Sequence, residues 1–275
     1  MKTIVFASFV VLLALGVASC GHSVDRSTTV ESKEVLYQRG HQRYLQMQLD
    51  AAEEDLRKAV AIDSSYQEAL VDLGFLMYDR AQKIAEKEDP QRIALLKDAT
   101  MDLARAEAAG ARDAEVYERL CELSSTLKDD RRFLTYASKF AERYPSDRQY
   151  YNLGVALEGV GDWQGIVKSQ KAAVEKFKTS PYLGGFYRQM GRAYMKMDRN
   201  QTAERVLTAG LTEVDRLLEG ASRTEGKSKT SAESRRWGDD RIGILLLLKH
   251  IHTQYRDTEK LERVERQLKD AGFSK

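Results

Sequence analysis

The sequence predicts an all-α fold in which pairs of helices stack into an elongated α-solenoid. The chain of 275 residues contains only three prolines and few β-branched runs, which favours helices over strands. A small residue returns at a regular spacing through five segments of the chain. Each is followed at fixed offsets by the small and large residues that let two helices cross closely, a pattern typical of stacked helical repeats.

The first 19 residues have the composition of an export signal. Lys2 precedes an apolar run over residues 4–17, which is shorter than the ~20 residues that span a bilayer as a helix. A short apolar run followed by small residues is typical of a secretory signal peptide. The sequence Val17-Ala18-Ser19-Cys20 then resembles the lipobox of bacterial lipoproteins. The alternative is an ordinary signal peptide with a cysteine at the cleavage site by chance.

The lipoprotein resemblance implies a lipid anchor. It implies that Cys20 is acylated and becomes the new N-terminus, and several acyl chains anchor a protein stably. Gly21 follows the cysteine in place of aspartate, which by resemblance to the enterobacterial sorting rule favours the outer membrane. Residues 20–32 are polar and rich in Ser and Thr. They are predicted to form a flexible tether with a reach of roughly 20 Å.

Charge and cysteine content exclude several classes of protein. Lys and Arg number 44 and Asp and Glu 42, so the formal net charge is +2. A nearly neutral chain lacks the basic face that nucleic-acid binding requires. If Cys20 is lipidated, Cys121 has no partner within the chain, so a disulfide framework is excluded. We expect Cys121 to be a small buried residue.

The clearest repeat covers residues 150–181. Gly154 is followed by Ile166, Gln170 and Ala173 at offsets of 12, 16 and 19. This unit resembles a tetratricopeptide (TPR) repeat, a helix-turn-helix of 34 residues in which a small residue in the first helix faces the second. The resemblance implies a right-handed superhelix whose concave groove is lined mostly by the first helices and binds peptide segments. A generic helical bundle is the alternative.

The same offsets fit four further segments, so about five repeats are predicted over residues 33–218. The segments start at Gly40, Gly74, Cys121 and Gly191, and the spacings between the five small residues in order are 34, 47, 33 and 37 residues. The long spacing indicates an insertion of 13 residues near 84–96, which we expect to extend the first helix and add a turn near Pro90.

The C-terminal part is predicted to close the stack. Residues 219–239 are rich in Gly, Ser and Lys without an apolar period, and we expect a flexible loop there. Residues 240–275 contain two apolar-periodic segments, which predict a capping helix pair. The stretch GASRTEGKS at 220–228 has five residues where a phosphate-binding loop needs four, and a helix precedes it, so no nucleotide site is expected.

Candidate binding residues follow from the TPR resemblance. Positions three before and one after the small residue tend to face the groove, and neighbouring polar residues extend the set. The candidates are Tyr37, His41, Phe75, Arg148, Tyr151, Asn152, Arg188 and Arg192. Aromatic residues gather in the first two repeats and arginines in the last two. We therefore expect the basic end to engage an acidic segment or a carboxylate, with a solvated face as the alternative.

Together these features predict a periplasmic TPR lipoprotein, anchored in the outer membrane, that acts as a scaffold or adaptor for an envelope assembly. Its partners would be envelope proteins or peptide segments in the groove, and the membrane through the lipid. A pilotin-like or β-barrel-assembly-like factor is the alternative, and a cell-wall enzyme is less favoured. The sequence contains no HExxH or Gly-x-Ser-x-Gly motif. We expect no catalysis, no metal and no cofactor.

Overall fold

A computed structural model describes residues 31–224 and 232–273. The export signal, Cys20 and most of the tether lie outside these residues. The described chain contains twelve α-helices, which are α1 (Lys33–Leu45), α2 (Leu49–Ile62), α3 (Gln67–Gln82), α4 (Pro90–Ala109), α5 (Ala114–Thr126), α6 (Asp130–Arg143), α7 (Asp147–Gly159), α8 (Trp163–Lys176), α9 (Leu183–Lys196), α10 (Asn200–Thr224), α11 (Ala232–Tyr255) and α12 (Thr258–Asp270).

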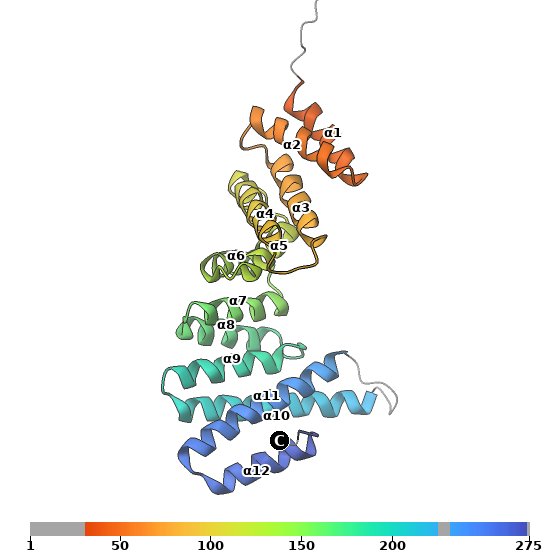
Figure 1. Cartoon of the computed structure of the whole chain (residues 1–275). Helices are drawn as coiled ribbons and strands as arrows, with labels where there is room; N and C mark the ends of the chain where they lie inside the picture. Colours follow the sequence, from red (N-terminus) through yellow and green to blue (C-terminus); the bar gives the residue numbers. More distant parts are fainter. Residues whose placement is uncertain (1–30, 225–231, 274–275) are drawn as a thin grey trace, which may run out of the picture.

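The helices pair in sequence and the pairs stack along one direction, so the predicted all-α solenoid is confirmed (Figure 1). Each odd-numbered helix packs against the even-numbered helix that follows it. The final helix α12 packs on α11 and buries Val264 and Leu268. Its other face is charged and exposed, as the end of a solenoid requires. The first and last helices lie at opposite ends of the molecule (Figure 1).

Close helix crossings occur where the sequence predicts them. A Cβ atom added to Gly40 would lie 2.9 Å from Leu56 Cγ, one on Gly74 would lie 2.5 Å from Leu103 Cγ, and one on Gly191 would lie 2.4 Å from Leu207 Cδ2. In each pair the small residue of the first helix faces the large residue sixteen positions later, or sixteen plus the insertion. The TPR-type packing of small against large residues is therefore present in the fold.

Five of the six pairs share one turn geometry. The residue seven positions after the small residue has a positive φ in four pairs, namely 60° at Met47, 56° at Lys128, 73° at Gly161 and 57° at Asp198. Arg256 (φ 53°) occupies the same place between α11 and α12. The next residue donates its N–H to a carbonyl five residues back, as in Asp129 to Ser124 (2.9 Å). This bond and the left-handed residue form a Schellman cap, which ends the first helix.

The inserted residues lengthen three elements of the second pair. Compared with the first pair, α3 is three residues longer than α1, the connection over residues 83–89 is four residues longer, and α4 is six residues longer than α2. Asp89 caps α4 through bonds from the N–H groups of Gln91 (2.7 Å) and Arg92, and Pro90 occupies the first turn, which suits its missing N–H. The insertion thus extends the first helix as expected, but its largest share extends the second helix.

The predicted loop over 219–239 is mostly helical. Helix α10 continues to Thr224 and α11 begins at Ala232, so only residues 225–231 lie outside the described part. The physical reason is burial at both helix ends. Leu217 and Trp237 are each 7% exposed, and the Trp237 indole N–H donates to the Ser180 carbonyl (2.9 Å). The prediction of a loop relied on the Gly, Ser and Lys content of the segment and did not take account of the buried residues Leu217 and Trp237.

The hydrophobic core is divided into two large clusters. One extends from Leu36 in α1 to Phe140 in α6 and includes Ala156, and the other extends from Ala173 in α8 to Leu268 in α12. Between them lies a small cluster of Leu157, Ile166 and Ala193. The stack therefore has least apolar packing around α7 and α8.

Buried polar groups occupy the boundary between the two clusters. Gln170 and Gln189 are 0% and 2% exposed, and their amide groups donate to the carbonyls of Tyr150 (3.0 Å) and Tyr151 (3.2 Å). Within the described residues neither Oε1 atom has a hydrogen-bond partner. A Cβ atom on Gly154 would lie 2.1 Å from Gln189 Oε1. A larger residue at this position would therefore displace the amide groups of Gln170 and Gln189.

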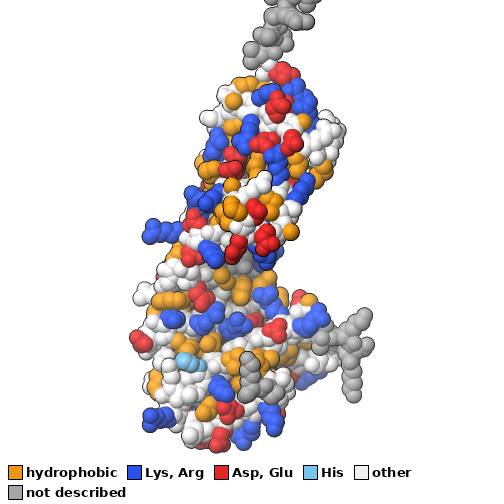
Figure 2. All heavy atoms as spheres, in the orientation of Figure 1, with side chains coloured by type: hydrophobic (Ala, Val, Ile, Leu, Met, Phe, Trp, Pro, Cys, Tyr) orange, Lys and Arg blue, Asp and Glu red, His pale blue; other side chains and the backbone are white. Residues whose placement is uncertain are grey.

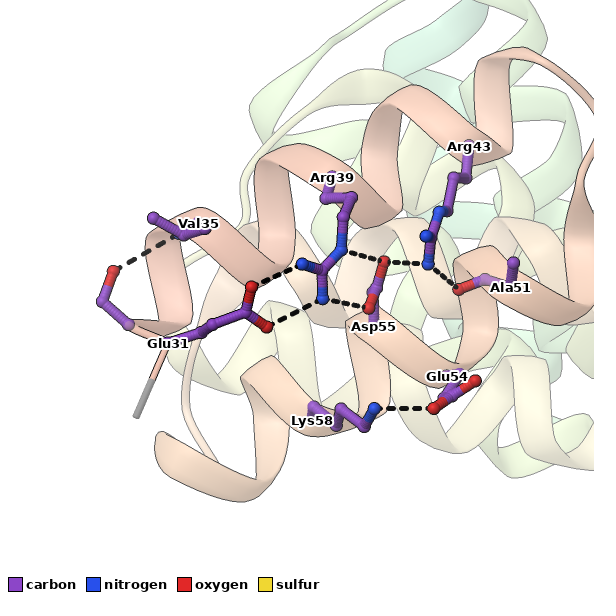
Figure 3. A network of polar contacts seen from close by, with 9 residues as sticks. Glu31, Val35, Arg39, Arg43, Ala51, Glu54, Asp55 and Lys58 are labelled. Atoms are coloured by element: carbon purple, nitrogen blue, oxygen red, sulfur yellow. Dashed lines mark hydrogen bonds and ion pairs between the residues drawn. The ribbon is translucent and has the colours of Figure 1, made fainter. Parts of the chain in front are cut away.

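An ion-pair network fastens the first helix pair (Figure 3). Asp55 on α2 is 1% exposed and accepts from Arg39 at 2.6 and 2.8 Å and from Arg43 at 2.5 Å. Arg39 also forms a bidentate pair with Glu31 (2.6 and 2.9 Å). The hydrogen bond from Arg39 lowers the pKa of Asp55 despite its burial. The network connects Glu31, α1 and α2, which form the end of the solenoid that follows the predicted tether.

Positive and negative side chains are interspersed over the face shown in Figure 2. None of the helices in residues 31–224 and 232–273 combines the length and the apolar character that a membrane span needs.

Candidate functional site

The first helices of successive pairs form one continuous surface, which we call the first-helix face. It comprises α1, α3, α5, α7, α9 and α11. Side chains on these helices contact one another across every pair boundary, as the contacts below show. The sequence-predicted binding residues all lie on these helices, and the predicted lipidation residue Cys20 lies outside the described part of the chain.

Tyr37 and His41 lie together at the start of the first-helix face. Their ring centroids are 5.6 Å apart, and the Tyr37 ring also meets Tyr66 edge-on at 5.4 Å. Burial raises the pKa of Tyr37 to about 12. His41 Nδ1 is 2.7 Å from Asp72 Oδ2 on α3. Burial raises the pKa of Asp72, although the bond to His41 acts in the opposite direction.

A second contact joins the same two helices one turn further on. The Tyr44 hydroxyl on α1 donates to Asp79 Oδ2 on α3 at 2.6 Å. The pKa of Tyr44 is raised by burial first, then by this hydrogen bond, and then by the charges of Asp79, Asp72 and Glu115. The negative charges of three carboxylates therefore raise the pKa of the Tyr44 hydroxyl.

Phe75 lies beside a cation that belongs to the chain itself. The Arg119 guanidinium on α5 lies 3.8 Å from the Tyr78 ring centroid and 5.8 Å from that of Phe75. Its Nη1 pairs with Glu122 Oε2 at 2.5 Å, and the Tyr78 hydroxyl donates to the other oxygen of Glu122 at 2.5 Å. Burial raises the pKa of Tyr78, and the bond to Glu122 adds to the increase.

A hollow of about 260 Å³ lies between α5 and α7. Cys121, Phe133 and Phe140 supply its apolar lining. Its polar lining consists of Glu118, Glu122, Ser125, Arg148, Gln149 and Asn152. Arg148 pairs across it with Glu118 at 3.1 Å, and both side chains are at least half exposed. The expected burial of Cys121 is present, since the residue is 7% exposed and burial raises the pKa of its thiol to about 12.

Tyr151 contributes to an aromatic and cationic cluster further along the face. Its ring centroid is 5.1 Å from that of Tyr182. The Arg236 guanidinium of α11 lies over both rings, at 3.7 Å from Tyr182 and 5.2 Å from Tyr151. The segment that supplies Arg236 is the one the sequence predicts to be a loop.

The two predicted arginines of α9 each have a carboxylate partner. Arg188 Nη1 on α9 is 2.8 Å from Asp240 Oδ1 on α11, and Arg192 Nη2 is 3.0 Å from Glu158 Oε2 on α7. Asp240 is 6% exposed, and burial raises its pKa although Arg188 and Arg236 lower it. These pairs fasten α7, α9 and α11 to one another. Because their charges are balanced, Arg188 and Arg192 do not form a free cationic surface.

The first-helix face thus brings the predicted residues into separate local groups. Tyr37 lies with His41, Arg148 and Asn152 share the hollow, and each of the other candidates contacts residues outside the predicted set. The residues of this face that sequence reasoning missed are Asp72, Asp79, Glu115, Arg119, Glu158, Tyr182, Arg236 and Asp240. Asp79 and Glu115 could have been found from the sequence, because both belong to predicted first helices.

The described residues hold no group of three or more His, Cys, Asp or Glu placed to bind a metal ion.

No protein-family model matches the sequence, and neither does the sequence of any curated protein. Among solved structures, YrrB, described as a TPR protein with an unusual peptide-binding site, is 16% identical with a TM-score of 0.49 over 68% of this chain and 88% of its own. MamA is 16% identical with a TM-score of 0.48 over 72% and 97%. PilF of Pseudomonas aeruginosa is 17% identical with a TM-score of 0.41 over 86% and 90%. Likeness of this degree says nothing about the ligand of this chain.

Proposed function

We propose that the protein is a lipid-anchored adaptor of the bacterial envelope that captures a segment of another protein on its first-helix face. The observation that supports capture is the continuity of this face. Aromatic and charged side chains from all six pairs of the described residues line it, and an open hollow of about 260 Å³ lies between α5 and α7. A groove with an apolar recess and a few polar groups suits an extended peptide.

The anchor part of the proposal rests on the Val17-Ala18-Ser19-Cys20 sequence. Attachment would confine the adaptor to a membrane surface and raise the local concentration of whatever it binds. Because the first helix begins at Lys33, few residues separate Cys20 from the folded body, so the partner would be held close to the bilayer.

Two measurements test the proposal. Palmitate labelling and membrane fractionation of the wild type and Cys20→Ala address the anchor. We expect the variant to lose the label and leave the membrane fraction, and an equally membrane-bound, labelled variant would contradict the anchor.

Capture is tested by placing a photo-crosslinking amino acid at Asn152, which lines the hollow, and at exposed Glu262 on α12 as the matched control. We expect a discrete crosslinked partner from Asn152 that Glu262 does not yield. Identical products at both positions, or none at either, would contradict capture on this face.

A further inference from the structure

The first three pairs carry a cation site that the chain fills with its own arginine. Arg119 lies over the Tyr78 ring at 3.8 Å and near the Phe75 ring at 5.8 Å, and it pairs with Glu122 at 2.5 Å. Two rings and a carboxylate are the surroundings that bind a guanidinium or ammonium group well. This arrangement shows which ligand chemistry this part of the surface accepts.

A neighbouring group on α1, α3 and α5 combines one aromatic ring, Tyr44, with carboxylates and contains no lysine or arginine. Tyr44 donates to Asp79 at 2.6 Å, and Asp79, Asp72 and Glu115 all act on the Tyr44 hydroxyl. Asp72 is engaged by His41 at 2.7 Å. Within residues 31–224 and 232–273, neither Asp79 nor Glu115 forms an ion pair with a lysine or arginine. Glu115 is exposed and Asp79 half-buried, so a ligand can reach both.

The hollow between α5 and α7 continues this surface. Glu122 belongs both to the Arg119 site and to the lining of the hollow. Beyond it Phe133, Phe140 and Cys121 provide an apolar lining. A chain that crossed from α1 to α7 would therefore meet a vacant anionic position, the occupied Arg119 position and then an apolar recess.

We propose that this surface, formed by Tyr44, Asp79, Glu115, Glu122 and the hollow, binds an extended peptide segment that carries lysine or arginine and an apolar side chain. Charge complementarity selects this occupant. Five carboxylates (Asp72, Asp79, Glu115, Glu118 and Glu122) face two arginines (Arg119 and Arg148) and His41. The basic group docks beside Asp79 and Glu115, and the apolar side chain enters the hollow.

This inference rests on the proposed function and names the chemistry of its partner. It assigns recognition to the surface from α1 to α7, whereas Arg188 and Arg192 are held by Asp240 and Glu158 and serve to fasten helices. The expected ligand is therefore basic, in contrast to the acidic ligand that the sequence pattern suggests.

The test uses the full-length chain and two fluorescent peptides of eight residues, (Lys-Leu-Lys-Ser)₂ and (Glu-Leu-Glu-Ser)₂, with binding followed by anisotropy at low and high salt. We expect the lysine peptide to bind and the glutamate peptide to fail. The double variant Asp79→Asn/Glu115→Gln should weaken the lysine peptide at least tenfold. The control Glu54→Gln removes a carboxylate that is 64% exposed on α2, and it should leave binding within twofold.

Folding is separated from recognition by a second variant. Glu115→Gln alone alters an exposed group and should keep the wild-type thermal midpoint while weakening the lysine peptide. The proposal is overturned if the lysine peptide does not bind at millimolar concentration, if the glutamate peptide binds more tightly, or if Glu54→Gln weakens binding as much as the double variant. Crosslinking from Asn152 that persists in any of these cases would leave the adaptor function standing and refute only the basic ligand.

Discussion

Gly191 lies where α9 crosses α10, and a Cβ atom there would be 2.4 Å from Leu207 Cδ2. We expect Gly191→Ala to lower the free energy of unfolding by about 1–3 kcal/mol, because a methyl group forces the crossing apart. Gly238 in α11 is the matched control, since nothing lies within 4 Å of an added Cβ. Gly238→Ala should raise the free energy of unfolding by up to about 1 kcal/mol. Urea titration followed by circular dichroism measures both, and equal effects would contradict the packing described.

Cys121 offers a second measurement on a single residue. Burial raises the pKa of its thiol to about 12, so at pH 8 the thiolate fraction is about three orders of magnitude below that of a free cysteine. In a Cys20→Ala background, where Cys121 is the only cysteine in the sequence, we expect slow reaction with a thiol reagent in the folded protein and fast reaction in urea. Rapid labelling of the native protein would show that the hollow exposes the thiol.

Sequence reasoning located the crossing residues better than the ion pairs, and the difference has a physical cause. Gly191 and Leu207 are linked by a fixed offset within one helix pair, so a one-dimensional pattern finds them. Arg188 and Asp240 are 52 residues apart and meet only because α11 packs against α9. The charge of Arg188 was visible in the sequence, but its partner was not, and the expected basic end depended on that partner.

The turns between paired helices lead to a prediction at the scale of the element. Lys128 and Gly161 occupy equivalent left-handed positions, with φ of 56° and 73°. A side chain in this conformation costs roughly 1 kcal/mol, which glycine avoids. We expect Lys128→Gly to stabilise the protein by up to about 1 kcal/mol and Gly161→Ala to destabilise it by a similar amount. Thermal midpoints of the two variants measure the effect, and shifts in the same direction would contradict it.

The extended second pair shows that the repeat spacing gives the length of an insertion but not the positions at which its helices begin. The spacing of Gly74 and Cys121 gave the size of the insertion correctly. It did not give its division, because the strong cap at Asp89 and the proline after it start α4 early. Similarly, the composition of residues 219–239 suggested a loop, whereas α10 continues to Thr224 and α11, in which Trp237 is buried, already begins at Ala232. In both cases a local anchor decided where the helix begins.

At the scale of the whole molecule, the divided core predicts unfolding in two stages. Solenoid stability is a sum of terms within pairs and between neighbours, and the apolar packing is smallest around α7 and α8. Hydrogen exchange should show α1–α6 and α9–α12 as two protected units with weaker protection between them. Leu207→Ala, which should cost about 2–5 kcal/mol, should lower the stability of the second unit and leave the first unchanged.

A matched variant checks the cause of this division. Gln170 occupies the position that Leu56 and Leu207 hold in other pairs, and its Oε1 lacks a partner among the described residues. Gln170→Leu replaces a buried polar group with the residue that fills this position elsewhere, and we expect it to bring the two transitions closer together. A single cooperative transition in the wild type, or no change in Gln170→Leu, would contradict the explanation.

The placement of the two ends of the stack at opposite extremes (Figure 1) has a mechanical consequence. If the N-terminal end is fixed and a load acts on the C-terminal helices, every junction between pairs experiences the same tension, since the pairs are connected in series. We expect the stack to yield first where the two large hydrophobic clusters meet, within the α7–α8 pair and beside the buried side chains of Gln170 and Gln189. Stretching would then separate α9–α12 from α1–α6 while both halves keep their own helices.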